Sequence, residues 1–299
     1  MMNTSSRRPV WIEAALNGPW GRDRQPGIPV TEAEIIADGI AAARAGAGII
    51  HVHAYDPETG RQNDDGATYA RIIEGIRATT DALVYPTIPL AGAALTGQAA
   101  GPAARFAHID FLASRGLIEM AVVDPGTVCF IDRRDGPAAL ASFVYTNTEA
   151  EIRHGLALAA THRLVPSYAI YEPGFTRAGA LLAGQTPGLA TPLYRFMFSD
   201  AFAWGFPPRR YGLEAHLALL GEAAPAAPWM IAGLGVDLED LVPHAVAAGG
   251  HVRTGLEDAP FGTETGNAGL VARMVQVVEA AGGRPATPAE IRTGLGLGG

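Results

Sequence analysis

The sequence predicts a (β/α)8 barrel, or TIM barrel, an α/β fold in which parallel strands alternate with helices. Eight short apolar runs occur along the chain, and a longer, alanine-rich amphipathic segment follows each of them. Doubly wound sheets show the same alternation, but usually with about five to seven strands. No Ser/Gly-rich linker divides the 299 residues, a length normal for one such barrel. We therefore expect a single domain, residues 1–299, with a C-terminal helical extension.

Apolar periodicity and capping residues predict the element boundaries. The first strand spans residues 10–16, and the first helix, residues 31–45, starts at Thr31, which is spaced for a capping box with Glu34. A further helix start is expected at residues 287–290, where proline follows a capping threonine. The other expected strands are residues 49–53, 82–87, 120–123, 164–171, 194–199, 229–232 and 251–254. The other expected helices are residues 68–79, 101–114, 149–161, 177–184, 211–221, 238–248 and 267–281.

Composition excludes several classes of protein. The 30 acidic and 22 basic residues give a formal charge of −8, which argues against a nucleic-acid partner. No apolar run reaches the ~18–20 residues of a membrane span, and no apolar segment follows the N-terminal arginines as in a secretory signal. The one cysteine, Cys129, excludes internal disulfides and is interpreted as a core residue. We expect a cytoplasmic protein without membrane contact.

The chain contains no lysine, because all 22 residues of the Lys+Arg total are arginine. Without lysine, the protein cannot be a Schiff-base aldolase, a pyridoxal-phosphate enzyme or a P-loop protein. If the protein makes or breaks carbon–carbon bonds, a metal ion is therefore the expected electrophile.

Two histidines stand at the end of the second predicted strand. His51 and His53 are two residues apart, so both side chains point to the same face of a strand. At the carboxyl end of a barrel strand, this face belongs to the active site. Two imidazoles supply part of a zinc site, which needs about three protein ligands and an open position. The short motif alone is equally typical of two partly buried structural histidines. His216 and the other histidines of predicted helices and loops are interpreted as structural or surface residues.

A second polar cluster accompanies the eighth predicted strand. Glu257 and Asp258 follow this strand, and Arg253 lies within it. The eighth strand of a barrel neighbours the first, and the second is one further on, so Glu257 can reach the two histidines. Asp258 would then act as a base that Arg253 orients. Adjacent acidic residues after a strand are also typical of helix N-termini, and both interpretations stay open.

Several stretches of the chain resemble the beta-keto acid cleavage enzyme family. The resemblance covers almost the whole length and is specific at both ends. The stretches that carry it are residues 14–18 (AALNG), 29–34 (PVTEAE), 45–47 (AGA), 50–53 (IHVH), 249–258 (GGHVRTGLED), Asn267 and residues 284–290 (RPATPAE).

The resemblance implies a (β/α)8 barrel that binds one divalent metal, usually Zn²⁺, and forms a homotetramer. It implies that His51, His53 and Glu257 are the metal ligands, and that Arg253 and Asp258 form the catalytic pair that deprotonates the α-carbon. The family reaction is a retro-Claisen exchange, in which a β-keto acid and acetyl-CoA give acetoacetate and a new acyl-CoA. The metal would stabilise the enolate and CoA would take up the acyl fragment, so no protein nucleophile is needed.

The substrate-recognition positions depart from the family pattern. Where the family has a Ser/Thr-Thr-Gly-Gly loop that holds a carboxylate, this chain has two prolines, and Thr87 is the side chain left to help. Asp124 stands where an asparagine normally reaches the substrate, and its charge would repel a carboxylate. Trp20 stands where members that handle an amino substrate have glutamate. Together with Glu13, these three residues are the predicted substrate-binding residues.

These departures indicate a bulkier or apolar β-keto acid, in a pocket lined by Trp20, Phe202 and Trp204. The sequence therefore predicts a metal-dependent acyltransferase that cleaves a carbon–carbon bond. Two alternatives stay open. One is hydrolysis or another lyase reaction at the same metal without CoA, and the other is a metal-containing binding protein without turnover. A base beside the metal favours an enzyme.

Overall fold

The computed structural model describes residues 7–89, 101–134 and 141–298. Eight strands form one parallel sheet, in the spatial order β6-β3-β2-β13-β12-β11-β10-β7. These strands are β2 (Ile12–Ala15), β3 (Ile49–Val52), β6 (Leu83–Pro86), β7 (Met120–Val122), β10 (Val165–Ile170), β11 (Leu193–Phe198), β12 (Trp229–Gly233) and β13 (His251–Thr254). The two end strands, β6 and β7, lie side by side, so the sheet curves into a barrel. The predicted (β/α)8 barrel is confirmed.

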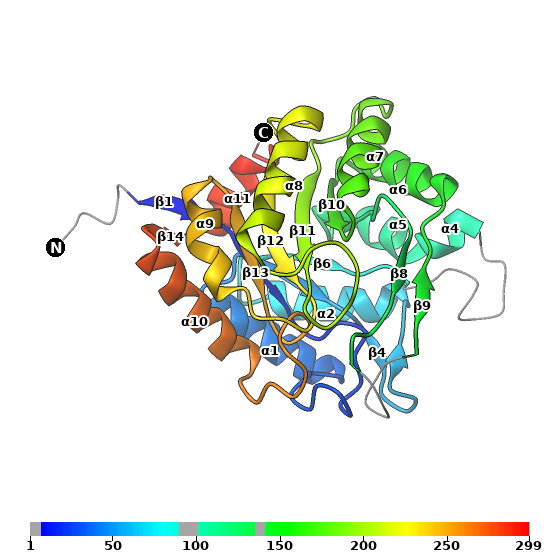
Figure 1. The fold of residues 1–299 in the computed structure, drawn as a ribbon. Coiled ribbons are helices and arrows are strands. Elements are labelled where there is room, and N and C mark those ends of the chain that lie inside the picture. Colours follow the sequence, from blue (N-terminus) through cyan, green and yellow to red (C-terminus); the bar gives the residue numbers. More distant parts are fainter. Residues whose placement is uncertain (1–6, 90–100, 135–140, 299) are drawn as a thin grey trace.

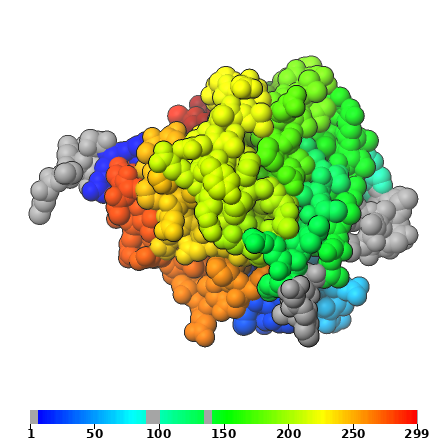
Figure 2. All heavy atoms as spheres, viewed as in Figure 1, coloured from blue at the N-terminus to red at the C-terminus, as the bar shows by residue number. Residues whose placement is uncertain are grey.

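Helices surround the strands, as Figure 1 shows. They are α1 (Glu32–Ala45), α2 (Gly66–Arg77), α4 (Gly101–Arg105), α5 (Ala107–Ala113), α6 (Glu149–His162), α7 (Pro173–Gly184), α8 (Arg210–Ala223), α9 (Val242–Ala247), α10 (Asn267–Ala280) and α11 (Pro288–Gly294), with a 3-10 turn, η2 (Glu239–Leu241), before α9. In a space-filling view of the same side, the segments around α8 and α9 cover the strands (Figure 2). Within the described residues, none of these helices combines the length and the apolar character that a membrane crossing requires.

Capping residues account for several helix starts. Thr31 accepts a hydrogen bond from the N–H of Glu34 and forms the predicted capping box at the start of α1. The same arrangement begins α6 at Thr148 and α11 at Thr287, so the helix start expected at residues 287–290 is confirmed. The predicted helix 101–114 is instead broken into α4 and α5, because Phe106 leaves the helical conformation.

Three pairs of short strands were not predicted. They are β1 (Arg8–Val10) with β14 (Gly283–Pro285), β4 (Tyr55–Asp56) with β5 (Arg61–Gln62), and β8 (Val128–Phe130) with β9 (Phe143–Tyr145). Strands of two or three residues are too short to give a periodic signal. The β8–β9 hairpin corrects one expectation, since Cys129 points outward and is exposed rather than in the core.

Candidate active site

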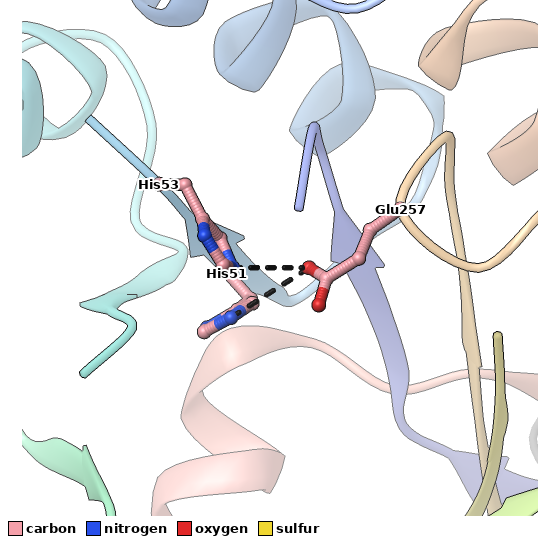
Figure 3. A group of neighbouring side chains, drawn as sticks. All are labelled: His51, His53 and Glu257. Atoms are coloured by element: carbon pink, nitrogen blue, oxygen red, sulfur yellow. Dashed lines mark ion pairs between the residues drawn. The ribbon is translucent and has the colours of Figure 1, made fainter. Parts of the chain in front are cut away.

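Three side chains meet at the carboxyl end of the barrel, as Figure 3 shows. His51 lies in β3, His53 follows this strand directly, and Glu257 lies in the turn after β13. The Nε2 atoms of His51 and His53 lie 3.7 Å and 3.6 Å from Oε2 of Glu257. One ligand atom from each residue lies within 4.8 Å of the others, and all three side chains are buried. The structure thus brings together the three residues that the resemblance implied as metal ligands.

Two glycines let Glu257 approach the histidines. Gly255 has φ of +132°, and a Cβ atom there would overlap the carbonyl oxygen of Ala15 in β2. Gly18 has φ of +63°, and a Cβ atom there would lie 2.5 Å from Cγ of Glu257. The N–H of Glu257 donates to the carbonyl of Ala15 at 3.2 Å, which holds the turn against β2. A larger residue at either glycine would push Glu257 away from the histidines.

The unpaired atoms of the triad fit a bound metal ion. Among the described residues, Nε2 of His53 and Oε2 of Glu257 are buried without a hydrogen-bond partner. Buried polar atoms of this kind normally have a partner, so two that face each other indicate a ligand between them. Burial lowers the pKa of His51 well below its ordinary value, against the opposing effect of Glu257, so its imidazole is neutral. Two imidazoles and a carboxylate form a donor set that Zn²⁺ accepts in catalytic sites.

Gln62 in β5 orients His53. Nδ1 of His53 lies 3.2 Å from Oε1 of Gln62, whose amide nitrogen donates to Oδ1 of Asp64 at 2.8 Å. With its nitrogen committed to Asp64, the amide presents its oxygen to His53, so Nδ1 carries the proton and Nε2 keeps its lone pair. Sequence reasoning missed Gln62, because it lies in a strand of two residues.

Arg253 joins Glu257 to two other buried carboxylates. Its Nη2 atom lies 2.9 Å from Oε1 of Glu257 and 2.7 Å from Oδ1 of Asp258, and its Nε donates to Oδ2 of Asp258 at 2.9 Å. Its Nη1 atom donates to Oε1 of Glu13 at 3.3 Å, and the Tyr85 hydroxyl donates to the same oxygen at 2.8 Å. One planar guanidinium therefore sets the positions of three carboxylates.

Asp258, the predicted base, directly follows Glu257 but is not among the described residues that line the triad pocket. Burial raises the pKa of Asp258 to about 6, against the lowering effect of Arg253. Asp258 and Arg253 border a second hollow, together with Asp237 and Arg273. Glu13 is fully buried. It is not among the described residues that line the triad pocket.

The pocket that contains the triad has a mainly apolar wall. Of the predicted substrate-binding residues, Trp20, Thr87 and Asp124 line it. Its remaining lining residues include Ile88, Val122, Phe130, Phe143, Tyr145, Ala169, Tyr171 and Leu234. Phe202 and Trp204 do not line the pocket within the described residues, which corrects the expectation. Their rings instead pack against the ring of Phe130 in the unpredicted β8–β9 hairpin, with centroids 5.2 Å and 5.8 Å away, and it is Phe130 that lines the pocket.

Two of the predicted substrate-binding residues use their donors within the protein. The indole Nε1 of Trp20 donates to the carbonyl of Glu257 at 2.8 Å. Thr87 donates its N–H to the carbonyl of Val52 at 3.0 Å and its hydroxyl to the carbonyl of Ile88 at 3.2 Å. Both residues shape the pocket, while their own donors point into the fold.

Asp124 shares the pocket with an arginine that sequence reasoning missed. The carboxylate of Asp124 accepts hydrogen bonds from the N–H of Ala169 and from the Tyr145 hydroxyl, both at 2.8 Å. Burial raises the pKa of Asp124, and Arg195 in β11 opposes this effect. The signal for Arg195 was present, since it is the one charged residue in the wholly buried strand LYRFMF.

The fold is similar to that of solved structures with distant sequences. A ternary complex of ObcA with a C4-CoA adduct and oxalate matches 91% of this chain and 68% of that chain, with a TM-score of 0.71 and 16% identity. The 3-dehydroquinate dehydratase of Geobacillus kaustophilus HTA426 matches 89% of this chain and 91% of that chain, with a TM-score of 0.53 and 11% identity. At these identities the likeness concerns the fold alone.

Curated relatives match nearly the whole chain. A 3-dehydrocarnitine:acetyl-CoA trimethylamine transferase of Rhizobium meliloti (strain 1021) is 28% identical over 99% of both chains. A 3-oxoadipate:acetyl-CoA acetyltransferase of Cupriavidus necator is 28% identical over 97% of this chain and 95% of the relative. A 3-keto-5-aminohexanoate cleavage enzyme of Fusobacterium nucleatum subsp. nucleatum is 26% identical over 92% of this chain and 93% of the relative. The family model for beta-keto acid cleavage enzyme matches residues 9–297, and the chain therefore belongs to the beta-keto acid cleavage enzyme family.

Proposed function

We propose that this protein is a metal-dependent acyltransferase that exchanges acyl groups between a β-keto acid and acetyl-CoA. The bond between C2 and C3 of the β-keto acid breaks, and C2 forms a new bond to the acetyl carbonyl carbon. The CoA thiolate takes up the released acyl group, so the products are acetoacetate and a new acyl-CoA. The observation that carries this proposal is the buried triad of His51, His53 and Glu257 in a pocket of a chain of this family.

The triad is proposed to hold a divalent ion, Zn²⁺ by its donor set. When bound, such an ion supplies a Lewis acid that polarises substrate oxygens. Gln62 keeps the lone pair of His53 directed into the triad, and Arg253 holds the second carboxylate oxygen of Glu257. The chain therefore supplies both the ligands and the contacts that orient them.

Asp258 and Arg253 are proposed as the pair that removes the proton from C2 and returns it to acetoacetate. Asp258 is buried, and Arg253 holds its carboxylate by hydrogen bonds of 2.7 Å to 3.1 Å. A carboxylate oriented in this way can serve as a general base. Arg253 contacts both Asp258 and the triad residue Glu257, so it connects the base to the reacting region. Glu13 then serves as a positioning residue, because its carboxylate accepts a hydrogen bond from Nη1 of Arg253.

The proposed substrate is a β-keto acid with one carboxylate and an uncharged, apolar tail. The aromatic wall that includes Trp20, Phe130 and Tyr171 favours such a tail. Arg195 balances one of the two carboxylates that line the pocket, Asp124 and Glu257. A divalent ion then leaves one positive charge in excess, which a single substrate carboxylate neutralises.

Isotopic labelling tests this function. Metal-loaded protein is mixed with acetyl-CoA carrying ¹³C in both acetyl carbons and with a panel of β-keto acids that differ in tail size and charge. The exchange puts the label at C3 and C4 of acetoacetate, with none at C1 and C2, and forms a matching acyl-CoA. Cleavage by water instead gives unlabelled acetate and leaves acetyl-CoA intact, which would refute the acyl exchange. His51→Ala is the matched control and should abolish the label.

A homotetramer, which the family resemblance implies, and a cytoplasmic location, which the composition favours, are also proposed. Light scattering on the purified protein tests the assembly, and a monomer at micromolar concentration would refute it.

A further inference from the structure

Arg195 is a buried cation with few partners. Its side chain projects from β11 into the lining of the triad pocket and is 3% exposed. Among the described residues, its one hydrogen bond runs from Nη2 to the carbonyl of Ser167 at 3.4 Å, and Nε has no partner. Arg253, which is buried to the same degree, contacts three carboxylates at 2.7 Å to 3.3 Å. A buried guanidinium normally has such partners, so Arg195 has donor capacity that the protein itself does not use.

Asp124 does not complete the set of partners for Arg195. The closest approach is 3.7 Å, from Nη2 of Arg195 to Oδ1 of Asp124, which is too long for a hydrogen bond. The two oxygens of Asp124 already accept from Ala169 and Tyr145. Asp124 therefore lowers the electrostatic cost of burying Arg195 without occupying its donors.

The described part of the loop after β6, residues 87–89, has few donors for a substrate carboxylate. Pro86 and Pro89 have no N–H, and Thr87 directs both of its donors to backbone carbonyls. A β-keto acid that enters this pocket carries a carboxylate that needs a buried hydrogen-bonding partner. Arg195 is a pocket-lining side chain with donors to spare.

From this arrangement we infer that Arg195 binds the carboxylate of the substrate. This inference rests on the proposed function, because it assigns a partner to the carboxylate of that substrate. Arg195 is then a substrate-binding and specificity-determining residue, which selects β-keto acids over their neutral esters.

Calorimetry with two matched probes tests the inference on metal-loaded protein. The probes are acetoacetate and its uncharged methyl ester, and acetyl-CoA is absent so that no exchange occurs. Arg195→Gln should weaken acetoacetate binding by roughly 10- to 100-fold, the loss typical of a charged hydrogen bond, and leave ester binding unchanged. In the full reaction, KM for the β-keto acid should rise while KM for acetyl-CoA stays the same. Arg195→Lys retains the charge without the planar donor set, so it should show a smaller loss.

A double variant separates substrate binding from charge balance. Asp124→Asn combined with Arg195→Gln removes one charge of each sign, so it keeps the net charge of the pocket. If Arg195 only neutralises Asp124, this double variant should recover the wild-type affinity for acetoacetate. If Arg195 binds the carboxylate, the double variant should remain as weak as Arg195→Gln. Circular dichroism and metal analysis verify that each variant is folded and loaded, and Arg195→Lys carries the test if Arg195→Gln does not fold.

Three results with the variants would overturn the inference: unchanged acetoacetate binding in Arg195→Gln, equal losses for acid and ester, or recovery in the double variant. A wild-type protein that does not bind acetoacetate would overturn it as well. The labelling assay distinguishes a failure of this inference from a failure of the proposed function. Label transfer with no effect of Arg195→Gln on binding or KM removes only the role of Arg195. A charge-dependent loss of binding without label transfer keeps the role of Arg195 and removes the acyl exchange.

Discussion

His216 in α8 should make the stability of the protein fall in mild acid. Its side chain is fully buried and stacks on Phe196, with ring centroids 4.5 Å apart and an interplanar angle of 10°. Phe198 and Phe206 meet its ring edge-on, and neither ring nitrogen has a hydrogen-bond partner among the described residues. Burial lowers the pKa of His216 from 6.5 to about 4. The folded protein therefore holds this histidine neutral over a range in which the unfolded chain protonates it.

The sign and size of the effect follow from proton linkage. Between pH 6.5 and pH 4 the unfolded chain binds a proton at His216 that the folded protein does not bind, so acid favours unfolding. From pH 7 to pH 5, the gap between pKa values of 6.5 and about 4 corresponds to a loss of about 2 kcal/mol in the free energy of unfolding.

Urea unfolding of metal-free protein at pH 7 and pH 5 measures this loss without a contribution from metal release. Other groups also titrate in this range, so the relevant quantity is the difference between wild type and variants without an ionisable group. His216→Phe and His216→Leu fill the site differently and should differ in absolute stability, but both should lose about 2 kcal/mol less than wild type on acidification. His244→Gln, at an exposed position in α9, should behave as wild type. Equal acid sensitivity of wild type and both His216 variants would refute a depressed pKa at His216.

The remaining predictions concern the candidate active site. His51→Ala should remove bound metal while the protein stays folded, and one retained equivalent in metal analysis would contradict its role as a ligand. Gln62→Ala should weaken metal affinity by about 10- to 100-fold through the loss of the contact to His53, measured by competition with a chelator; an unchanged affinity would show that Gln62 does not orient this ligand. Asp258→Asn should keep the metal but slow the exchange by about 10²- to 10⁴-fold, and an unaltered rate would exclude it as the base.

The sequence predicted the barrel because the repeat of strand and helix is long and regular. It also predicted the triad, since the spacing of His51 and His53 puts both on one strand face, and barrel order brings Glu257 near them. Neither spacing nor barrel order showed that Arg195 lines the pocket. Strands of a parallel barrel are buried on both faces and form continuous apolar runs, so their pattern does not reveal which residues face inward. All six residues of β11 are buried, and the structure is needed to show that Arg195 lines the pocket.

The wall of the pocket was misassigned for a different reason. Departures from the family pattern made Phe202 and Trp204 the expected lining. The β8–β9 hairpin instead contributes Phe130 and Phe143. Its strands have three residues each, which is too short to give a periodic signal.

The charges of Asp124 and Arg195 offset each other in the pocket. From sequence alone, an aspartate at position 124 was expected to repel the carboxylate of the substrate. The structure places the guanidinium of Arg195 3.7 Å from this aspartate, close enough to offset its charge and far enough to leave donors available. Either residue alone would leave a buried charge in the pocket without compensation, whereas the pair holds a cation with available donors in the pocket. Asp124, which departs from the family pattern, and Arg195 can therefore preserve carboxylate recognition together, and the affinity of the Asp124→Asn, Arg195→Gln double variant for acetoacetate decides whether they do.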